Sequence, residues 1–475
     1  MRRRAFWHVL LSLAILTQGS TLQRPEDQAE LWSPPIDITG GSTENWRASG
    51  RAVCDRFQNL HVFWIDNGDE DSAIYYRNDL EDAWSQPRDV VVAPDTLNYD
   101  LVAVAANDSL HLAWRAASGG LYYSGSPIAY AEDPSAWSPP QLLDEPVFSV
   151  SLAVGPEGTL HLVYSSPDPE GLEYYVVHRS SADNGETWTD PRVVFNITFT
   201  SPSYIRTEMA MDAANRIHIG LTLRSQEYGR NSEVGYLRSE DGGQTWGAYR
   251  MIESRTDAPP GLEWIAPYAF GENEVHLTWH DPGRMHQWST DGGTTWSGAV
   301  QIQELGAAFG GPNALARDSA GTMYAVTAWS DGVYASRWLG SNWSIPVPID
   351  LREIDPHGQQ ITVCQGNVLH VLYHDRTGDE TVWYSSRTTA ASHVPRLPLP
   401  EMPPLATQPA TSLAQTEAPS TSTMSPTLTP ASAMPFNRGP IVPAPSPVAP
   451  LVIGTLSVLG LLAAVVVIRL KKAGR

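Results

Sequence analysis

The chain has 475 residues, with 31 basic and 52 acidic side chains and a net charge of −21. This acidic balance argues against nucleic acid and against anionic lipid as partners of the main body of the chain. The length is too great for one simple core unless that core is built by repetition.

The amino terminus has the layout of a secretory signal. Three arginines (Arg2, Arg3 and Arg4) precede the apolar run "AFWHVLLSLAILT", and the small and polar residues "QGS" follow it. We therefore expect residues 1–20 to be a signal peptide, and the part that follows to be exported. The alternatives are an uncleaved anchor and a buried first helix.

A strand signature of an apolar residue, a histidine and a second apolar residue occurs six times along the chain. A seventh copy, "MYAVTAW" at 323–329, has Tyr324 in place of the histidine. The six histidine copies are "LHVFW" (60–64), "LHLAW" (110–114), "LHLVY" (160–164), "IHIGL" (217–221), "VHLTW" (275–279) and "LHVLY" (369–373). Because these histidines recur at equivalent positions, we expect them to be packing residues rather than catalytic ones.

Each copy belongs to a longer unit. A short strand-like run precedes it, another follows it, and a tryptophan with a fourth strand closes the unit. These tryptophans are 47 to 58 residues apart: Trp84, Trp137, Trp188, Trp246, Trp296 and Trp343. Four short strands in a period near 50 residues are typical of propeller blades. The sequence predicts an all-β, seven-bladed β-propeller over residues 30–390 with four antiparallel strands per blade, and six blades as the alternative.

The two ends of the repeat region complete each other. The tryptophan strand "LWSPPIDI" at 31–38 has no partners before it, and the last unit has three strands without a fourth. We expect the amino-terminal strand to complete the last blade, which would leave no open sheet edge.

Three turns share one pattern, Ser-x-Asp-x-Gly-x-Thr-Trp, at 181–188, 239–246 and 289–296. The aspartate can accept backbone N–H bonds within its loop, the glycine allows a left-handed backbone, and the tryptophan is an apolar plug. We interpret these residues as structural, against the alternative of metal ligands or catalytic acids. They are Asp183, Gly185, Trp188, Asp241, Gly243, Trp246, Asp291, Gly293 and Trp296.

The two cysteines, Cys54 and Cys364, fall on the first strands of the first and last blades. These blades are neighbours in a closed ring, and an exported pair is expected to be oxidised. The sequence leaves two alternatives open, a disulfide that locks the closure and two buried free thiols.

The region after the repeats changes composition. Residues 393–450 are rich in Pro, Ser, Thr and Ala and read as a disordered stalk. Residues 451–468 contain no charge and are long enough for a single transmembrane helix. Residues 469–475 are basic, as expected of a cytoplasmic tail. These features predict a single-pass protein of the cell membrane with its propeller outside, in contact with the membrane through the C-terminal helix.

The repeated turn is the Asp-box, and with this spacing the chain resembles the sialidase (neuraminidase) and BNR-repeat superfamily over roughly residues 30–390. The resemblance implies a propeller whose boxes lie on the face opposite the active site. A sialidase of this family uses three arginines, a tyrosine nucleophile with a glutamate, and an aspartate as acid/base.

The residues that match those roles are candidates only, because the family's Arg-Ile-Pro motif is missing. Arg51 or Arg47 in "NWRASGRAVCD" takes the place of the first arginine. The loop "IDNGDEDS" offers Asp66, Asp69 and Asp71. Further candidates on the same face are Arg206, Glu208, Glu263 and Tyr268, with Arg224, Arg230 and Arg284 after second strands.

Three functions remain open. The first is a surface-anchored propeller that binds glycans or extracellular proteins at its central face, with Trp46, Tyr204 and Trp264 as stacking residues. The second is an exo-acting glycoside hydrolase of the exo-α-sialidase type, and the third is a structural role at the envelope. No metal spacing or phosphate loop is present in the sequence. We therefore expect no cofactor and a monomeric propeller.

Overall fold

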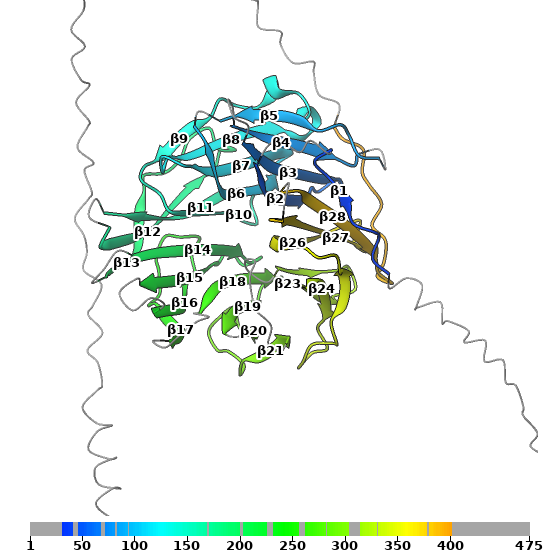
Figure 1. Cartoon of the computed structure of the whole chain (residues 1–475). Helices are drawn as coiled ribbons and strands as arrows, with labels where there is room; N and C mark the ends of the chain where they lie inside the picture. The colour runs from blue at the N-terminus through cyan, green and yellow to red at the C-terminus, as the bar shows by residue number, and fades with distance from the viewer. Residues whose placement is uncertain are drawn as a thin grey trace, which may run out of the picture. The chain divides into compact units, whose positions relative to one another are not determined.

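The computed structural model describes residues 31–400, except for gaps at 41–45, 68–71, 81–82, 94, 169–170, 200–202, 226–230, 256–261, 282, 304–313, 330 and 378–379. Its strands form seven four-stranded antiparallel sheets. The sheets are arranged as blades around a common centre (Figure 1). The predicted all-β propeller of seven blades is confirmed, and the alternative of six blades is wrong.

In blades 1 to 6 the strands run outward from the centre in chain order, whereas the outermost strand of blade 7 is β1. Blade 1 holds β2 (Trp46–Cys54), β3 (Leu60–Asn67), β4 (Ser72–Asn78) and β5 (Arg88–Val92). Blade 2 holds β6 (Leu97–Ala106), β7 (Ser109–Ala116), β8 (Leu121–Pro127) and β9 (Gln141–Asp144), with the 3₁₀ turns η1 (Ile128–Tyr130) and η2 (Pro134–Ala136) before β9. Blade 3 holds β10 (Ser149–Val154), β11 (Leu160–Pro167), β12 (Glu173–Ser181) and β13 (Arg192–Thr198).

The remaining blades repeat this order. Blade 4 holds β14 (Ser203–Met211), β15 (Ile217–Ser225), β16 (Asn231–Ser239) and β17 (Arg250–Arg255). Blade 5 holds β18 (Glu263–Phe270), β19 (Glu274–Asp281), β20 (Gly283–Ser289) and β21 (Val300–Gln303). Blade 6 holds β22 (Ala314–Arg317), β23 (Met323–Trp329), β24 (Gly332–Arg337) and β25 (Val347–Asp350). Blade 7 holds β26 (Pro356–Cys364), β27 (Val368–Asp375), β28 (Val382–Thr388) and β1 (Ile36–Asp37).

The ring closes through the amino-terminal strand, as the sequence predicts. In blade 7, β1 pairs with β28, with Ile36 opposite Tyr384. The Ser33 amide donates to the Ser386 carbonyl at 2.8 Å, and Trp32 packs in the same apolar cluster as Trp383. The outer edge of the last sheet is therefore supplied by residues more than 300 positions away, which ties the two ends of the propeller together.

Cys54 and Cys364 form a disulfide across the same seam. Cys54 ends β2 and Cys364 ends β26, and their Cα atoms are 5.5 Å apart. The bond links the innermost strands of blades 1 and 7, so of the two alternatives that the sequence leaves open the structure has the bridge.

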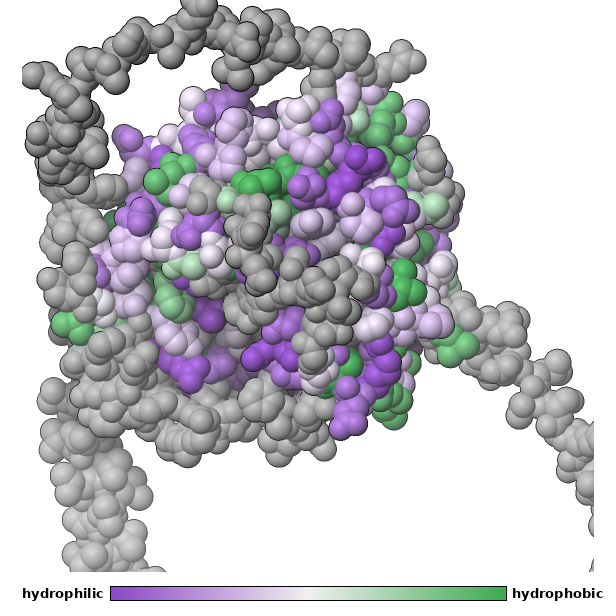
Figure 2. Space-filling model, turned by 45° about the horizontal axis from the view of Figure 1, so that its top comes forward, coloured by the Kyte–Doolittle hydropathy of each residue, from purple (hydrophilic) through white to green (hydrophobic). Residues whose placement is uncertain are grey.

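Apolar side chains fill the spaces between neighbouring blades. One cluster joins blades 1 and 2 through Phe63 and Ile65 on one side and Leu112, Trp114 and Trp137 on the other. Burying an aromatic side chain of this size contributes a few kcal/mol at about 25 cal/mol per Å². Among the coloured residues in Figure 2, polar ones are the more numerous, and apolar ones form separate small groups.

The recurring histidines pack inside the blades, as predicted. His61 contacts the Tyr76 hydroxyl through Nδ1 at 2.7 Å and the Asp55 carboxylate through Nε2 at 3.1 Å. His111, His218 and His370 likewise meet a tyrosine hydroxyl on the next strand. In blade 3 the tyrosine is replaced by a second histidine, and His161 lies 3.1 Å from His178 between ring nitrogens.

The Asp-box turns are held by their aspartates. In blade 4, Asp241 accepts hydrogen bonds from the Thr245 amide at 2.7 Å, the Thr245 hydroxyl at 2.5 Å and the Ser239 hydroxyl at 2.8 Å. These bonds, led by the one from the threonine hydroxyl, lower the pKa of Asp241 to about 2. Asp183 and Asp291 make the same set of bonds, so all three aspartates stabilise the turns in which they lie.

The blades have two different faces. In blade 4, the turn between β14 and β15 and the Asp-box after β16 lie on one side, where Gly242 of the box approaches Asn215 of the turn. We call this side the box face. The innermost strands begin at the opposite side, which we call the open face, and the loops between second and third strands also lie there.

Residues 393–400 do not belong to the stalk that the composition predicts there. The Val394 amide donates to the Gln365 carbonyl at 2.8 Å, and the Leu397 amide donates to the Phe57 carbonyl at 3.0 Å. Arg396 pairs with Asp79 at 2.8 Å. The segment therefore crosses the box face from blade 7 to blade 1, because its amides and one arginine find partners on turns of both blades.

None of the helices in the described residues is long and apolar enough to span a membrane. The predicted signal peptide, residues 1–20, the predicted membrane helix, residues 451–468, and the basic tail, residues 469–475, lie outside the described residues.

Candidate functional site

Two oppositely charged residues lie at one level of the innermost strands. Arg51 on β2 lies opposite Phe63, two positions after His61, and Glu208 on β14 lies opposite Gly220, two positions after His218. Because the histidines occupy equivalent places in blades 1 and 4, this register puts Arg51 and Glu208 at the same depth of their innermost strands.

Both Arg51 and Glu208 are half-buried. Burial raises the pKa of Glu208 to about 7; nearby Asp100 also raises it, and the cation of Arg51 opposes the rise. Burial lowers the pKa of Arg51, against the attraction of Glu208 and Asp100. A carboxyl group with a pKa near neutrality can both give and accept a proton at pH 7.

Tyr268 on β18 completes this group from a deeper position. It lies opposite His276 in the register of blade 5, and the Leu315 backbone hydrogen bonds to its hydroxyl. Burial and the neighbouring Glu208 raise the pKa of Tyr268, so the phenol is protonated at neutral pH. The structure thus brings together three of the predicted residues, Arg51, Glu208 and Tyr268.

A second group lies nearer the open face, where the innermost strands begin. The Arg206 guanidinium carbon lies 4.3 Å from the Trp264 ring centroid, 5.7 Å from that of Tyr204 and 5.9 Å from that of Phe148. The Phe148 and Tyr204 rings stack on each other at 5.0 Å. These four side chains, which we call the aromatic–arginine cluster, come from the beginnings of innermost strands or the loops before them, in blades 3, 4 and 5.

Two ion pairs flank the cluster. Arg115 at the end of β7 pairs with Asp100 at 2.9 Å and lies over the Phe148 ring. Arg224 at the end of β15 pairs with Glu263 and donates to the Tyr204 hydroxyl at 2.7 Å. The predicted residues Arg206 and Glu263 therefore lie in this outer group.

Other predicted residues have different places. Asp69, Asp71 and Arg230 lie outside the described residues, as do the side chains of Trp46 and Arg47. Asp66 is buried on β3. Arg284 is fully buried, where it contacts His280 Nδ1 at 3.0 Å and donates to the Ala328 carbonyl at 2.7 Å. Arg284 lies at the end of blade 5 nearest the open face, but its side chain is buried against Ala328 of blade 6.

Sequence reasoning missed Asp100, Arg115 and Phe148. The rule that selects Arg224, an arginine at the end of a second strand, also selects Arg115 after "LHLAW". Phe148 and Asp100 have no comparable signal, because their role depends on neighbours in other blades.

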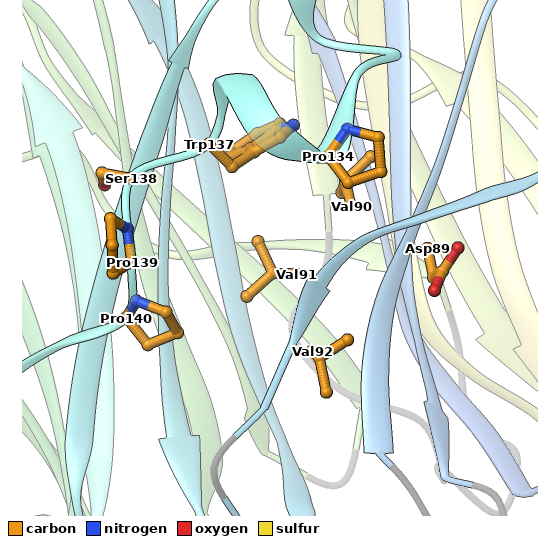
Figure 3. A pocket seen from close by; sticks show the side chains of 9 residues that line it. All are labelled: Asp89, Val90, Val91, Val92, Pro134, Trp137, Ser138, Pro139 and Pro140. Carbon is orange, nitrogen blue, oxygen red and sulfur yellow. The ribbon is translucent and has the colours of Figure 1, made fainter. Parts of the chain in front are cut away.

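A hollow of about 240 Å³ lies elsewhere, at the outer edge of blades 1 and 2 (Figure 3). Valines of β5 and prolines around η2 form most of its wall, together with Trp137. Asp89 is its sole charged lining residue, so the hollow offers little chemistry. The described residues also contain no group of three or more His, Cys, Asp or Glu side chains placed to hold a metal ion.

The chain was compared with known proteins. Residues 127–326 match the family of the BNR repeat-like domain. A search of curated proteins gives no match. Among solved structures, an ulvan lyase of polysaccharide lyase family 25, bound to -[GlcA(1-4)Rha3S]-, is similar with a TM-score of 0.53 and 11% identity, over 75% of this chain and 96% of that one.

Two further structures are similar over comparable lengths. The Hadza microbial sialidase Hz136 has a TM-score of 0.45 and 13% identity, over 74% of this chain and 68% of that one. The α-L-arabinanase of Penicillium chrysogenum has a TM-score of 0.48 and 10% identity, over 75% and 98%. The ulvan lyase, with its higher TM-score and 11% identity, shows a shared fold and carries no activity across. Residues 127–326 therefore form a BNR repeat-like domain within a seven-bladed propeller.

Proposed function

We propose that the open face binds a glycan at the aromatic–arginine cluster. The observation that carries this proposal is the convergence of Phe148, Tyr204 and Trp264 around Arg206 on the open face. Aromatic rings offer flat apolar surface to the C–H face of a sugar, and guanidinium groups offer fixed N–H donors to its oxygens. An extracellular protein is the alternative ligand for the same surface.

The test is a binding measurement on an oligosaccharide array, followed by titration calorimetry of any sugar that binds. Trp264→Ala should weaken binding about tenfold, as the loss of a central aromatic anchor does. Trp246→Ala is the matched control, because Trp246 is also half-buried but belongs to an Asp-box on the other face. Equal losses in both variants, or no sugar bound by the unaltered protein, would refute the proposal.

Hydrolysis of a glycosidic bond is the second candidate function, and Glu208 favours it. Its pKa of about 7 suits proton transfer, and Arg51 and Tyr268 stand near it. The test is turnover of a panel of fluorogenic glycosides that includes a sialoside, by the unaltered protein and by Arg51→Ala, Tyr268→Phe and Glu208→Gln. Turnover abolished by all three changes would support an enzyme, whereas a folded protein without turnover would leave the binding function.

The sequence also supports display at the cell surface as a monomer. We propose that residues 1–20 direct export and that residues 451–468 anchor the chain, with residues 469–475 in the cytoplasm. Protease added to intact cells should then remove the propeller while a short C-terminal fragment stays with the membrane. A propeller that resists protease until the cells are broken would contradict this location.

The third function that the sequence leaves open, a structural role at the envelope, requires neither sugar binding nor turnover.

A further inference from the structure

The segment that crosses the box face has a regular burial pattern over residues 394–400. Its sequence there is "VPRLPLP", and it belongs to no strand or helix. Arg396 and Leu399 are half-buried, whereas the other five residues are exposed. A polyproline II helix has three residues per turn, so side chains three positions apart lie on one edge of it. The burial pattern is that of such a helix with one edge against the propeller.

The half-buried residues hold the segment on successive blades. Arg396 pairs with the Asp79 carboxylate of blade 1 at 2.8 Å and donates to the carbonyl oxygens of Asp79 and Leu80 at 2.6 and 3.1 Å. Leu399 packs against the apolar cluster that joins blades 1 and 2. Because the Val394 amide is bonded to blade 7, the segment runs from blade 7 across blade 1 toward blade 2.

The hollow between β5 and η2 adjoins the same apolar cluster. Val90, Val91 and Trp137 belong both to the cluster that Leu399 contacts and to the wall of the hollow (Figure 3). Three prolines and Val92 complete most of this wall, and Val92 is 58% exposed. Apolar grooves with an aromatic wall bind proline-rich segments, because a polyproline II helix loses little conformational entropy on binding.

The amino-acid sequence continues the pattern beyond the described residues. Met402 and Leu405 stand three and six positions after Leu399, and prolines occupy positions 400, 403 and 404. A polyproline II helix rises about 3.1 Å per residue, so Met402 would lie about 9 Å beyond Leu399 along its axis. The edge that carries Arg396 and Leu399 would therefore also carry Met402 and Leu405.

We propose that residues 401–405 extend this segment as a polyproline II helix and bind in the hollow through Met402 and Leu405. The occupant of the hollow is then this chain's own continuation, and the predicted stalk begins after residue 405. Binding would also remove the exposed surface of Val92 from water, which favours it. This inference is independent of glycan binding, because it concerns the box face and the outer edge of blades 1 and 2.

The first experiment places a short diazirine side chain at position 402 of the full-length protein and maps the photochemical cross-links by mass spectrometry. We expect cross-links to residues 89–92 and 134–140 of the same chain. The same group at position 401 is the matched control, because that position lies on a different edge of the helix. It should give few cross-links to the hollow.

The second experiment measures cleavage after Glu401 by a glutamate-specific protease. Val92→Asp puts a charge into the apolar wall, so this cleavage should become about fivefold faster than in the unaltered protein. Val193→Asp is the matched control, since Val193 lies on the outermost strand of blade 3 and is 48% exposed. It should leave the rate unchanged, and cleavage after Glu417 should be equal in all three proteins.

Several results would overturn the proposal. Cross-links from position 402 to other parts of the propeller, or none at all, would show that the hollow does not hold the segment. Cross-links between two chains would assign the hollow to a second copy. Equal cleavage after Glu401 in the unaltered protein and in Val92→Asp would also contradict it. None of these results would change the standing of glycan binding at the open face.

Discussion

Arg51 and Glu208 lie at one depth on the innermost strands of blades 1 and 4, and each shifts the pKa of the other. They are 157 positions apart in the sequence, and the ring brings them together.

The first prediction concerns the ionisation of Glu208. Its pKa is about 7 in the folded protein and near 4.5 in the unfolded chain. The folded state therefore binds more protons between these values, and the free energy of unfolding should fall as pH rises from 4.5 to 7. Denaturant titrations of the unaltered protein and Glu208→Gln should diverge by at most about 3 kcal/mol across this window. Parallel curves would contradict the raised pKa.

The second prediction concerns the buried histidine pair of blade 3. Burial lowers the pKa of His161 to about 4 and that of His178 to about 3. Because the unfolded histidines bind protons below about pH 6.5 and the folded ones do not until about pH 4, stability should be lost as pH falls through this window.

His178→Tyr is the variant that tests it, since tyrosine stands opposite the histidine in blades 1, 2, 4 and 7. The variant should lose less stability than the unaltered protein between pH 6.5 and 5, measured by thermal unfolding at each pH. An unchanged pH dependence would show that this pair does not contribute to acid sensitivity.

The third prediction concerns the box glycines. A Cβ on Gly243 would lie 2.4 Å from the His178 ring, and its φ is +90°. Gly243→Ala should therefore cost at least about 2 kcal/mol of stability. Gly247→Ala is the control, because its added Cβ would meet no atom closer than 3.4 Å. Chemical denaturation would measure both, and equal stabilities would contradict the packing described for the box.

The fourth prediction concerns the seam between blades 7 and 1. Replacing Cys54 and Cys364 together by serine should destabilise the propeller by about 2–5 kcal/mol. The ring should still close, because β1 remains paired with β28. Calorimetric unfolding with and without reductant gives the comparison, and the double variant should be insensitive to reductant. An unaltered protein with equal unfolding temperatures in both conditions would contradict a stabilising bridge.

The sequence predicts the propeller because the blade is a local unit. The histidine strand, the box and the tryptophan strand each recur at fixed spacing, and the unpaired "LWSPPIDI" strand indicates how the ring closes. The composition of residues 393–400 is misleading, because a proline-rich segment can be ordered when turns such as those at Gln365 and Phe57 offer carbonyl acceptors.

The candidate site is predictable only in part. Arg51, Glu208 and Tyr268 are found by their positions on innermost strands. The aromatic–arginine cluster depends on which side chains of three blades meet, as Phe148 and Arg206 do, and on an irregular backbone at Trp264. The repeats determine neither this cluster nor the backbone at Trp264, because they fix strand positions and leave the loops of the open face free to vary.

The most direct test of glycan binding at the open face is a crystal structure of the protein with an oligosaccharide that it binds in solution. We expect the sugar beside Trp264 and Arg206, with its ring on the aromatic side chains and its polar substituents toward the guanidinium. A sugar bound instead on the box face, or in the hollow between β5 and η2, would contradict the account.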